Sequence, residues 1–212
     1  MTPEATVVVQ LPAGEWEERT EVLENGDGAA LVDARLYRGT DPNRFLVHES
    51  VAEHMMEISV PVLHPDNPRS GDVPLIGESL EDHGQYKPIV VNRGTYSRRY
   101  EPWTIGAGNH TLQGAKLKGW THIGVSVVDV SDNELDRILL VDNRSSDLAY
   151  YRTEILAKVL ARVGNERTGY SDEAANAVHA AMTAPEPREY DEDAADGVKM
   201  LKCPNCEHEF PA

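Results

Sequence analysis

The stretch GAGNHTLQGAKLKGW, residues 106–120, places two glycines and an Asn-His-Thr triplet in front of a helix-like run. The segments beside it, YEPWTI before and THIGVSVVDV after, have the character of strands. Such a strand-to-helix turn suits anion binding, because the first N–H groups of a helix lack internal partners and glycine lets a ligand approach the backbone. The pattern predicts a phosphate site at Gly106, Gly108, Asn109, His110 and Thr111. Taken alone, it also fits a plain turn with a structural histidine.

The composition limits the classes of function open to the chain. Its 212 residues suffice for one ordinary core with an appendage. The formal net charge of -16 argues against binding DNA over the whole surface, so any nucleic-acid contact must be local. The apolar runs are too short to cross a membrane, the N-terminus lacks signal-peptide features, and two cysteines make no disulfide framework. We therefore expect a soluble, cytoplasmic protein with no membrane partner.

Hydrophobic patterning divides the chain into five parts. Residues 1–50 form a β-rich extension, in which TVVVQL and AALVDARLY are expected strands. The main domain spans residues 51–147 and contains a helix at VPLIGESLEDH, with Asp72 as its N-cap, followed by a buried strand at KPIVVN. The remaining parts are two helices in residues 148–184, an acidic solvated linker at residues 185–197, and a Cys-x-x-Cys tail at residues 198–212.

Three further signals follow the strand THIGVSVVDV. SDNE is a capping-box pattern, with Ser131 as the cap and Glu134 three residues later, and it predicts the start of a helix. VDNRSSD is polar and predicts a turn. LAYYRTEILAKVLARV then carries an apolar stripe at helical spacing, and SDEAANAVHAAM predicts a second capped helix. The stripe consists of Leu148, Tyr151, Ile155, Val159 and Val163.

The order of these motifs resembles the N-terminal domain of the ParB/sulfiredoxin superfamily. It is most similar to the ParB-like nuclease domains of bacteriophages and mobile elements. The motifs that carry the resemblance are SLEDHGQYKPIVV, GAGNHTLQGAKLKGW, HIGVSVVDVSDNE and VDNRSSDLAYYRTEIL, within the span from Ile58 to Val163. The resemblance implies an α+β fold, a small mixed sheet with surrounding helices, joined here to the β-rich N-terminal extension and a helical C-terminal part.

The resemblance also implies a nucleotide site assembled from three segments. In the family, the segment similar to HGQYKPIVV contributes to a nucleotide pocket, the glycine turn cradles phosphates, and the segment similar to VDNRSSD closes the site beside a metal. If the site is catalytic, the reaction is phosphoryl transfer or phosphodiester hydrolysis, with His110 polarising the phosphate and Asn143 helping to place Mg²⁺. Asn143 and Arg144 should then face His110 across one cleft. Outside the glycine turn the implied residues are Gly84, Gln85, Lys87, Pro88, Asp142, Asn143 and Arg144.

Two departures from the family pattern keep other functions open. Chromosome-partitioning ParB proteins place paired arginines where this chain has His110 and Thr111, so the guanidinium grip on phosphate must come from elsewhere. The candidates are Arg98, Arg99 and Arg144. Sulfiredoxins carry a cysteine where this chain has Asn109, which excludes sulfinic-acid reduction. The alternative function is a non-catalytic interaction protein with a degenerate pocket, whose acidic surface binds a basic host or phage protein, or mimics nucleic-acid charge. Sequence-specific DNA binding ranks lowest, because of the acidic charge.

The C-terminal CPNCEHEF is a Cys-x-x-Cys knuckle that corresponds to half of a zinc ribbon. Zinc takes four ligands, so Cys203 and Cys206 need His208 or the same tail of a second copy, which would make a homodimer. The alternative is a metal-free tail with reduced thiols. A separate group of acids could hold Mg²⁺, although it fits a helix cap and an exposed helix face better. These acids are Asp129, Asp132, Glu134 and Asp136.

Overall fold

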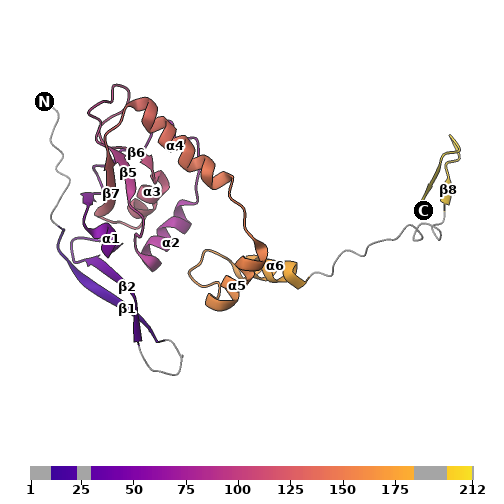
Figure 1. The fold of residues 1–212 in the computed structure, drawn as a ribbon, viewed down its shortest axis with the longest axis horizontal. Coiled ribbons are helices and arrows are strands. Elements are labelled where there is room, and N and C mark those ends of the chain that lie inside the picture. Colours follow the sequence, from indigo (N-terminus) through magenta and orange to yellow (C-terminus); the bar gives the residue numbers. More distant parts are fainter. Residues whose placement is uncertain (1–10, 23–29, 184–199, 212) are drawn as a thin grey trace.

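A computed structural model describes residues 11–22, 30–183 and 200–211. These residues form three sheets and six helices (Figure 1). The predicted strand TVVVQL, apart from its last residue, and the predicted linker at residues 185–197 lie outside the described ranges. Within those ranges, no helix has the length and apolar character needed to span a bilayer. The helices are α1 (Glu49–Ala52), α2 (Val73–His83), α3 (Asn109–Leu117), α4 (Asp132–Asp147), α5 (Thr153–Val163) and α6 (Asp172–Thr183).

The first sheet is antiparallel and contains the strands nearest the N-terminus. In spatial order they are β1 (Gly14–Val22), β2 (Ala30–Gly39) and β3 (Leu46–His48). β2 confirms the strand predicted at AALVDARLY, whereas no strand was predicted at β1. Leu36, Phe45 and Val47 belong to the same buried cluster as Ile89 and Ile105 of the central sheet. The N-terminal sheet therefore shares the main core of the molecule.

The central sheet is small and mixed, as predicted. Its strands are β4 (Met55–Glu57), β5 (Ile89–Asn92), β6 (Thr104–Ala107) and β7 (His122–Val128), in the spatial order β4-β7-β5-β6. β5 and β7 run parallel, and the other neighbours are antiparallel. β4 and β6 are shorter than the segments predicted at MMEISVPVL and YEPWTI, because turns replace part of each segment. The Val60 N–H donates to the Glu57 carbonyl, and the Thr104 N–H donates to the Glu101 carbonyl.

Helices α2 and α3 pack closely against each other beside this sheet. The Asp72 side chain accepts a hydrogen bond from the backbone N–H of Leu75, which confirms the predicted N-cap of α2. Gly114 of α3 meets Gly77 of α2, where a Cβ on Gly114 would lie 3.0 Å from the Gly77 nitrogen. The two glycines thus let α3 approach α2 backbone to backbone, and this holds the first turn of α3 beside the end of α2.

Helix α4 begins where predicted, but its N-terminal capping and its C-terminal end differ from the prediction. It begins after Ser131, but the Ser131 side chain makes no capping hydrogen bond. Glu134 instead pairs with Arg137 at 2.9 Å, so the capping box does not form. The helix continues through VDNRSSD to Asp147, and the predicted turn there is wrong. The segment lacks the Gly or Pro that commonly ends a helix, so its polar composition is that of an exposed helix.

Helices α5 and α6 pack on each other beyond the end of α4 (Figure 1). α6 confirms the predicted second helix, and the Ser171 hydroxyl caps it by accepting a hydrogen bond from the Ala174 N–H. The predicted stripe on and before α5 is exposed, while Ala157 and Leu160 are the buried residues of this helix. The third sheet is an antiparallel hairpin of β8 (Met200–Lys202) and β9 (Glu209–Pro211).

Candidate functional site

The glycine turn enters α3 through Gly108, whose backbone has a left-handed φ of 95°. A Cβ at this position would lie 2.6 Å from Cγ2 of Ile89, so the position requires glycine. Within the described residues, no hydrogen bond is found for the backbone N–H groups of Asn109, His110 and Thr111. The first turn of α3 therefore offers three free donors at the positive end of the helix dipole, an arrangement that binds anions.

Residues from two segments of the predicted site meet in one cavity beside this turn. Gly84, Gln85 and Lys87 follow α2, and together with Thr111 they line a cavity of about 180 Å³. The Lys87 side chain is exposed and makes no ion pair within the described ranges. Pro88 was predicted with these residues but lines a separate hollow of about 500 Å³. The cavity thus combines a lysine, a hydroxyl and a helix N-terminus.

A second cavity, of about 260 Å³, is lined by Asn109 and His110 together with the loop before α2. This loop, residues 64–72, was not predicted as part of the site. The loop contributes Arg69 to the cavity, beside His110. Arg69 therefore brings a guanidinium group to the cavity that His110 lines. Its position in a Pro- and Asn-rich loop, outside any helical or strand period, gave no signal in the sequence.

The imidazole of His110 holds this loop against α3. Its Nε2 lies 3.0 Å from the backbone nitrogen of Gly71 and 3.1 Å from the carbonyl oxygen of Arg69. An unprotonated Nε2 accepts the bond from Gly71, and a protonated Nε2 donates to the Arg69 carbonyl. A Cβ on Gly71 would lie 2.8 Å from the ring, so the contact is tight. His110 is thus placed to position Arg69.

The last turns of α4 reach the same loop. The Asn143 amide donates to Oδ1 of Asn67 at 3.4 Å, and the Arg69 guanidinium donates to the Asn143 carbonyl at 3.3 Å. Arg69 also forms an ion pair with Asp147 at 3.3 Å. Asn143 and His110 therefore both contact the loop that carries Arg69. The prediction that they face each other directly is wrong.

Three other predicted site residues lie away from the two cavities beside α3. Asp142 and Arg144 are exposed on α4, and their backbone carbonyls accept hydrogen bonds within and just after the helix. Gly106 packs beneath α4, where a Cβ would lie 2.9 Å from Cδ1 of Leu135. Gly106 thus lets α4 pack closely on β6.

Two predicted binding residues are buried amides with structural partners. Gln85 is 1% exposed, its Nε2 donates to the carbonyls of Lys87 and Gly124 at 3.0 and 2.9 Å, and its Oε1 accepts from the Gly124 N–H at 2.7 Å. Oδ1 of Asn109 accepts from the His64 N–H at 2.8 Å. These side chains fix the walls of the cavities.

The acids after β7 anchor a loop to the start of α4. Asp132 accepts hydrogen bonds from the Ser97 hydroxyl and from the N–H groups of Arg98 and Arg99, at 3.0 Å for each N–H. The Ser97 bond and then the Arg98 bond lower the pKa of Asp132. The Arg99 guanidinium is held by Asp136 at 2.7 Å. The Arg99 guanidinium is therefore already paired with a carboxylate.

A buried polar group that the sequence did not reveal lies beside this anchor. The His64 ring lies 4.5 Å from the Tyr100 ring, and its Nε2 is 3.4 Å from a carboxylate oxygen of Asp136. That Nε2 is buried without a hydrogen bond among the described residues. Burial, followed by hydrogen bonds to Asp136 and Asp66, raises the pKa of Tyr100. The group ties the loop before α2 to α4.

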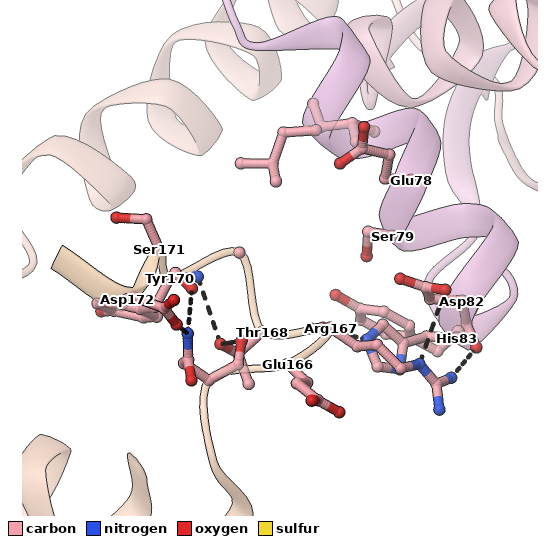
Figure 2. Close-up of a pocket in the computed structure, with 15 residues that line it drawn as sticks. Glu78, Ser79, Asp82, His83, Glu166, Arg167, Thr168, Tyr170, Ser171 and Asp172 are labelled. Atoms are coloured by element: carbon pink, nitrogen blue, oxygen red, sulfur yellow. Dashed lines mark hydrogen bonds and ion pairs between the residues drawn. The ribbon is translucent and has the colours of Figure 1, made fainter. Parts of the chain in front are cut away.

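A larger cleft of about 780 Å³ lies between α2 and the loop that joins α5 to α6 (Figure 2). Arg167 closes one end, because its guanidinium donates to the Asp82 carbonyl and lies 3.7 Å from the Asp82 carboxylate. The His83 ring donates to the Arg167 carbonyl at 2.6 Å. The cleft adjoins the cavity beside Lys87, since the two share lining residues: Ile76, Ser79 and Tyr86.

The predicted metal residues Cys203, Cys206 and His208 lie in the loop of the β8–β9 hairpin. Hydrogen bonds from the backbone N–H groups of Asn205 and Cys206 lower the pKa of the Cys203 thiol. Across the described ranges, no three His, Cys, Asp or Glu side chains are grouped closely enough to hold a metal. His208 is thus not placed with the two thiols as a third ligand within one chain.

No protein-family model matches the sequence, and no curated protein matches it. A structure of the C-terminally truncated chromosome-partitioning protein ParB from Caulobacter crescentus, complexed with CTP-gamma-S, does match. It has a TM-score of 0.51 at 18% identity, covering 63% of this chain and 79% of that one. A second structure of that protein, complexed to the centromeric parS site, has a TM-score of 0.35 at 18% identity and covers 63% and 73%. The narrower resemblance to phage nuclease domains stays a prediction. The first match confirms the predicted architecture: the chain has a ParB-like α+β fold.

Proposed function

We propose that the chain binds a nucleotide by its phosphates at the first turn of α3. The observation that carries the proposal is the set of unpartnered N–H groups at Asn109, His110 and Thr111, beside a cavity that contains Lys87. Free helix N-terminal donors bind phosphate oxygens directly. The fold supports the same assignment, because the ParB of Caulobacter crescentus was solved in complex with CTP-gamma-S.

The positive charge for the phosphates comes from outside the glycine turn. Lys87 lines one cavity with Thr111, and Arg69 lines the adjacent cavity with His110. Arg69 is held at the rim by Asn143 and Asp147. An ammonium acts on phosphate as a point charge, whereas a guanidinium can make two parallel hydrogen bonds. In this proposal the two side chains replace the paired arginines that the family places in the turn itself.

The small volume of the cavity beside Lys87 supports placing only the phosphate end of the ligand there. The cavity beside Lys87 has about 180 Å³. Pockets for small-molecule ligands usually have about 300–1,000 Å³. The rest of the nucleotide must therefore extend into one of two neighbours, the loop cavity of about 260 Å³ or the α2 cleft of about 780 Å³. A substitution at Glu78, which lines the α2 cleft but not the cavity beside Lys87, tests the cleft, and one at Asn67 tests the loop cavity.

We propose that Mg²⁺ binds together with the nucleotide phosphates. This ion is usually bound by one or two carboxylates together with substrate phosphates, and it keeps several waters. Asn143, near the end of α4, contacts the loop that carries Arg69 and would supply a protein oxygen atom. His110 already contacts Gly71 and Arg69, so we assign it the positioning of Arg69. Binding is the function that this arrangement supports, and hydrolysis of the ligand is not part of the proposal.

The proposal is tested by calorimetric titration of the full chain with CTP, ATP, GTP and UTP, with and without Mg²⁺. At least one nucleotide should bind, and Lys87→Ala should weaken it about tenfold or more. A hydrogen bond to a charged group contributes about 1.5–3 kcal/mol, and about 1.4 kcal/mol is tenfold in affinity. Lys158→Ala, an exposed lysine on α5 that lines none of these cavities, is the matched control.

Two results would count against the site. Unchanged affinity in Lys87→Ala, with the fold intact, would place the nucleotide elsewhere. If no nucleotide binds at millimolar concentration, the leading function becomes that of a non-catalytic protein whose acidic surface binds a basic partner.

A further inference from the structure

The Cys-x-x-Cys segment is presented by a regular hairpin. Strands β8 and β9 pair in antiparallel register, with Leu201 opposite Phe210. The connecting loop is closed by two backbone hydrogen bonds, from the Cys203 N–H to the His208 carbonyl and from the Glu207 N–H to the Cys203 carbonyl, each at 2.9 Å. Both thiols are free, with Cys203 half-buried and Cys206 exposed. The loop thus holds two sulfur ligands at the tip of a defined element.

This hairpin is incomplete in two independent ways. Zinc in structural sites takes four ligands, yet within the described ranges no third His, Cys, Asp or Glu joins the two thiols. An isolated two-stranded hairpin is also marginally stable in water. Its apolar cross-strand pair is uncovered, since Leu201 and Phe210 are each 42% exposed. Among the residues that the structure describes, the hairpin therefore has neither two further zinc ligands nor a packing partner.

We propose that the hairpins of two copies of this chain share one zinc ion. Cys203 and Cys206 of each copy would supply the four thiolates of a tetrahedral site. The same pairing would bring the exposed Leu201 and Phe210 side chains of two hairpins together, so that each hairpin covers the apolar surface of the other. Four thiols release four protons to solvent when they bind one Zn²⁺, and no oxidant or reductant is involved.

The other partners that these residues could recruit are less well matched. His208 already uses its backbone carbonyl to close the loop, and its side chain is not grouped with the thiols. Two thiolates with two waters in one chain would make a weak site, because each protein ligand that is replaced by water lowers the affinity. A second copy supplies two identical ligands at once, and it needs no other molecule.

The test uses the full chain, purified under reducing conditions, stripped with a chelator and reloaded with Zn²⁺. Metal content is measured by elemental analysis, and molar mass by light scattering. The expected result is one zinc per two chains and a dimer that becomes a monomer when zinc is removed. Cys203→Ser and Cys206→Ser should each lose the metal and the dimer together, whereas His208→Ala should keep both.

Three outcomes would overturn the proposal. These are one zinc per chain in a monomer, a dimer that persists without zinc, and no zinc retained by the reloaded protein. Substitution with Co²⁺ adds a readout of the ligands, because a four-thiolate site and a mixed sulfur–nitrogen site have different visible spectra. Lys87→Ala should leave metal content and molar mass unchanged, so failure here is distinguishable from failure of the nucleotide proposal.

Discussion

Gly108 meets two requirements at once, a left-handed backbone and a close approach to β5. Its φ of 95° disfavours any residue with a side chain, and Ile89 fills the space that a Cβ would need. Gly119, at the other end of α3, has a φ of 70°, but a Cβ there would meet no atom within 4 Å. Comparing Gly108 with Gly119 therefore separates the effect of a left-handed backbone from the effect of steric crowding.

Gly108→Ala should therefore destabilise the fold more than Gly119→Ala. The left-handed backbone costs about 1–2 kcal/mol in both variants, and crowding against Ile89 adds about 1–3 kcal/mol in Gly108→Ala alone. Urea unfolding of the two variants and the wild type measures the difference. Equal losses of unfolding free energy would show that β5 yields to the new methyl group.

Arg69→Ala should weaken nucleotide binding about tenfold or more, since a charge-assisted hydrogen bond contributes about 1.5–3 kcal/mol and about 1.4 kcal/mol is tenfold. Its loss should change the melting temperature little, because its ion pair with Asp147 is exposed. Arg137→Ala removes a comparable exposed pair on α4 and is the control. Calorimetric titration beside thermal unfolding checks both parts. Loss of stability without loss of affinity would make Arg69 a structural residue.

Among individual residues, the sequence singled out some that line the cavities beside α3 and did not single out others. The glycine turn and the segment after α2 were recognisable, and the cavity indeed combines Lys87 with Thr111. Gln85 and Asn109 were predicted as ligand-binding residues, but their amides are buried against backbone groups. Sequence pattern does not distinguish a buried amide from an exposed one, because both are polar. Arg69 was missed because its position depends on how a long loop folds back on α3.

Among the elements, α4 connects the site to the sheet. Its first turn is fixed through Asp132 to the loop at Ser97, and its last turns contact the loop that carries Arg69. The sequence pattern predicted the beginning of this helix, but it predicted a loop turn at VDNRSSD, where the helix in fact continues. The polar composition of VDNRSSD suggested a turn. An exposed helix can also be polar on every side, so composition does not distinguish the two. The deciding feature was the lack of a helix-ending Gly or Pro in VDNRSSD.

Asp132→Asn should destabilise the protein in a pH-dependent way. Hydrogen bonds from Ser97 and then Arg98 hold the pKa of Asp132 below its ordinary value, so the ionised form stabilises the fold. This stabilisation is complete above the ordinary carboxyl pKa of about 4, and it is lost as pH falls toward the lowered pKa. The difference in melting temperature between wild type and variant should be largest near neutral pH and shrink below about pH 4. A difference that does not change with pH would contradict the role of the charge.

Across the whole molecule, the end of α2 is where three parts of the chain meet. Arg19 of β1 and Arg167 of the α5–α6 loop both donate to the Asp82 carbonyl, and His48 donates to the His83 carbonyl at 2.8 Å. Basic side chains at a helix C-terminus satisfy its free carbonyls and its dipole. The sequence predicted the helices and the mixed sheet from local pattern, but it held no sign of this junction, because the partners are distant in the chain.

Arg167→Asn should loosen the α5–α6 loop without unfolding the core. Arg167 has a left-handed φ of 60°, which asparagine tolerates, so the change removes the guanidinium and leaves the backbone unstrained. Amide hydrogen exchange of residues 165–172 should accelerate about tenfold, while exchange in β5 and β7 stays unchanged. Glu166→Asn, in the same loop, is the control. Faster exchange throughout the sheet would mean that the helical pair supports the core itself.

The central claim, that phosphates bind the free donors at the first turn of α3, is tested most directly by amide NMR. Spectra of the ¹⁵N-labelled full chain are recorded during titration with CTP and, separately, with inorganic triphosphate. The expected result is saturable shifts of the Asn109, His110 and Thr111 amides with both ligands, together with shifts near Lys87. Saturable binding that leaves these three amides unmoved, or no change at millimolar ligand, would contradict the account.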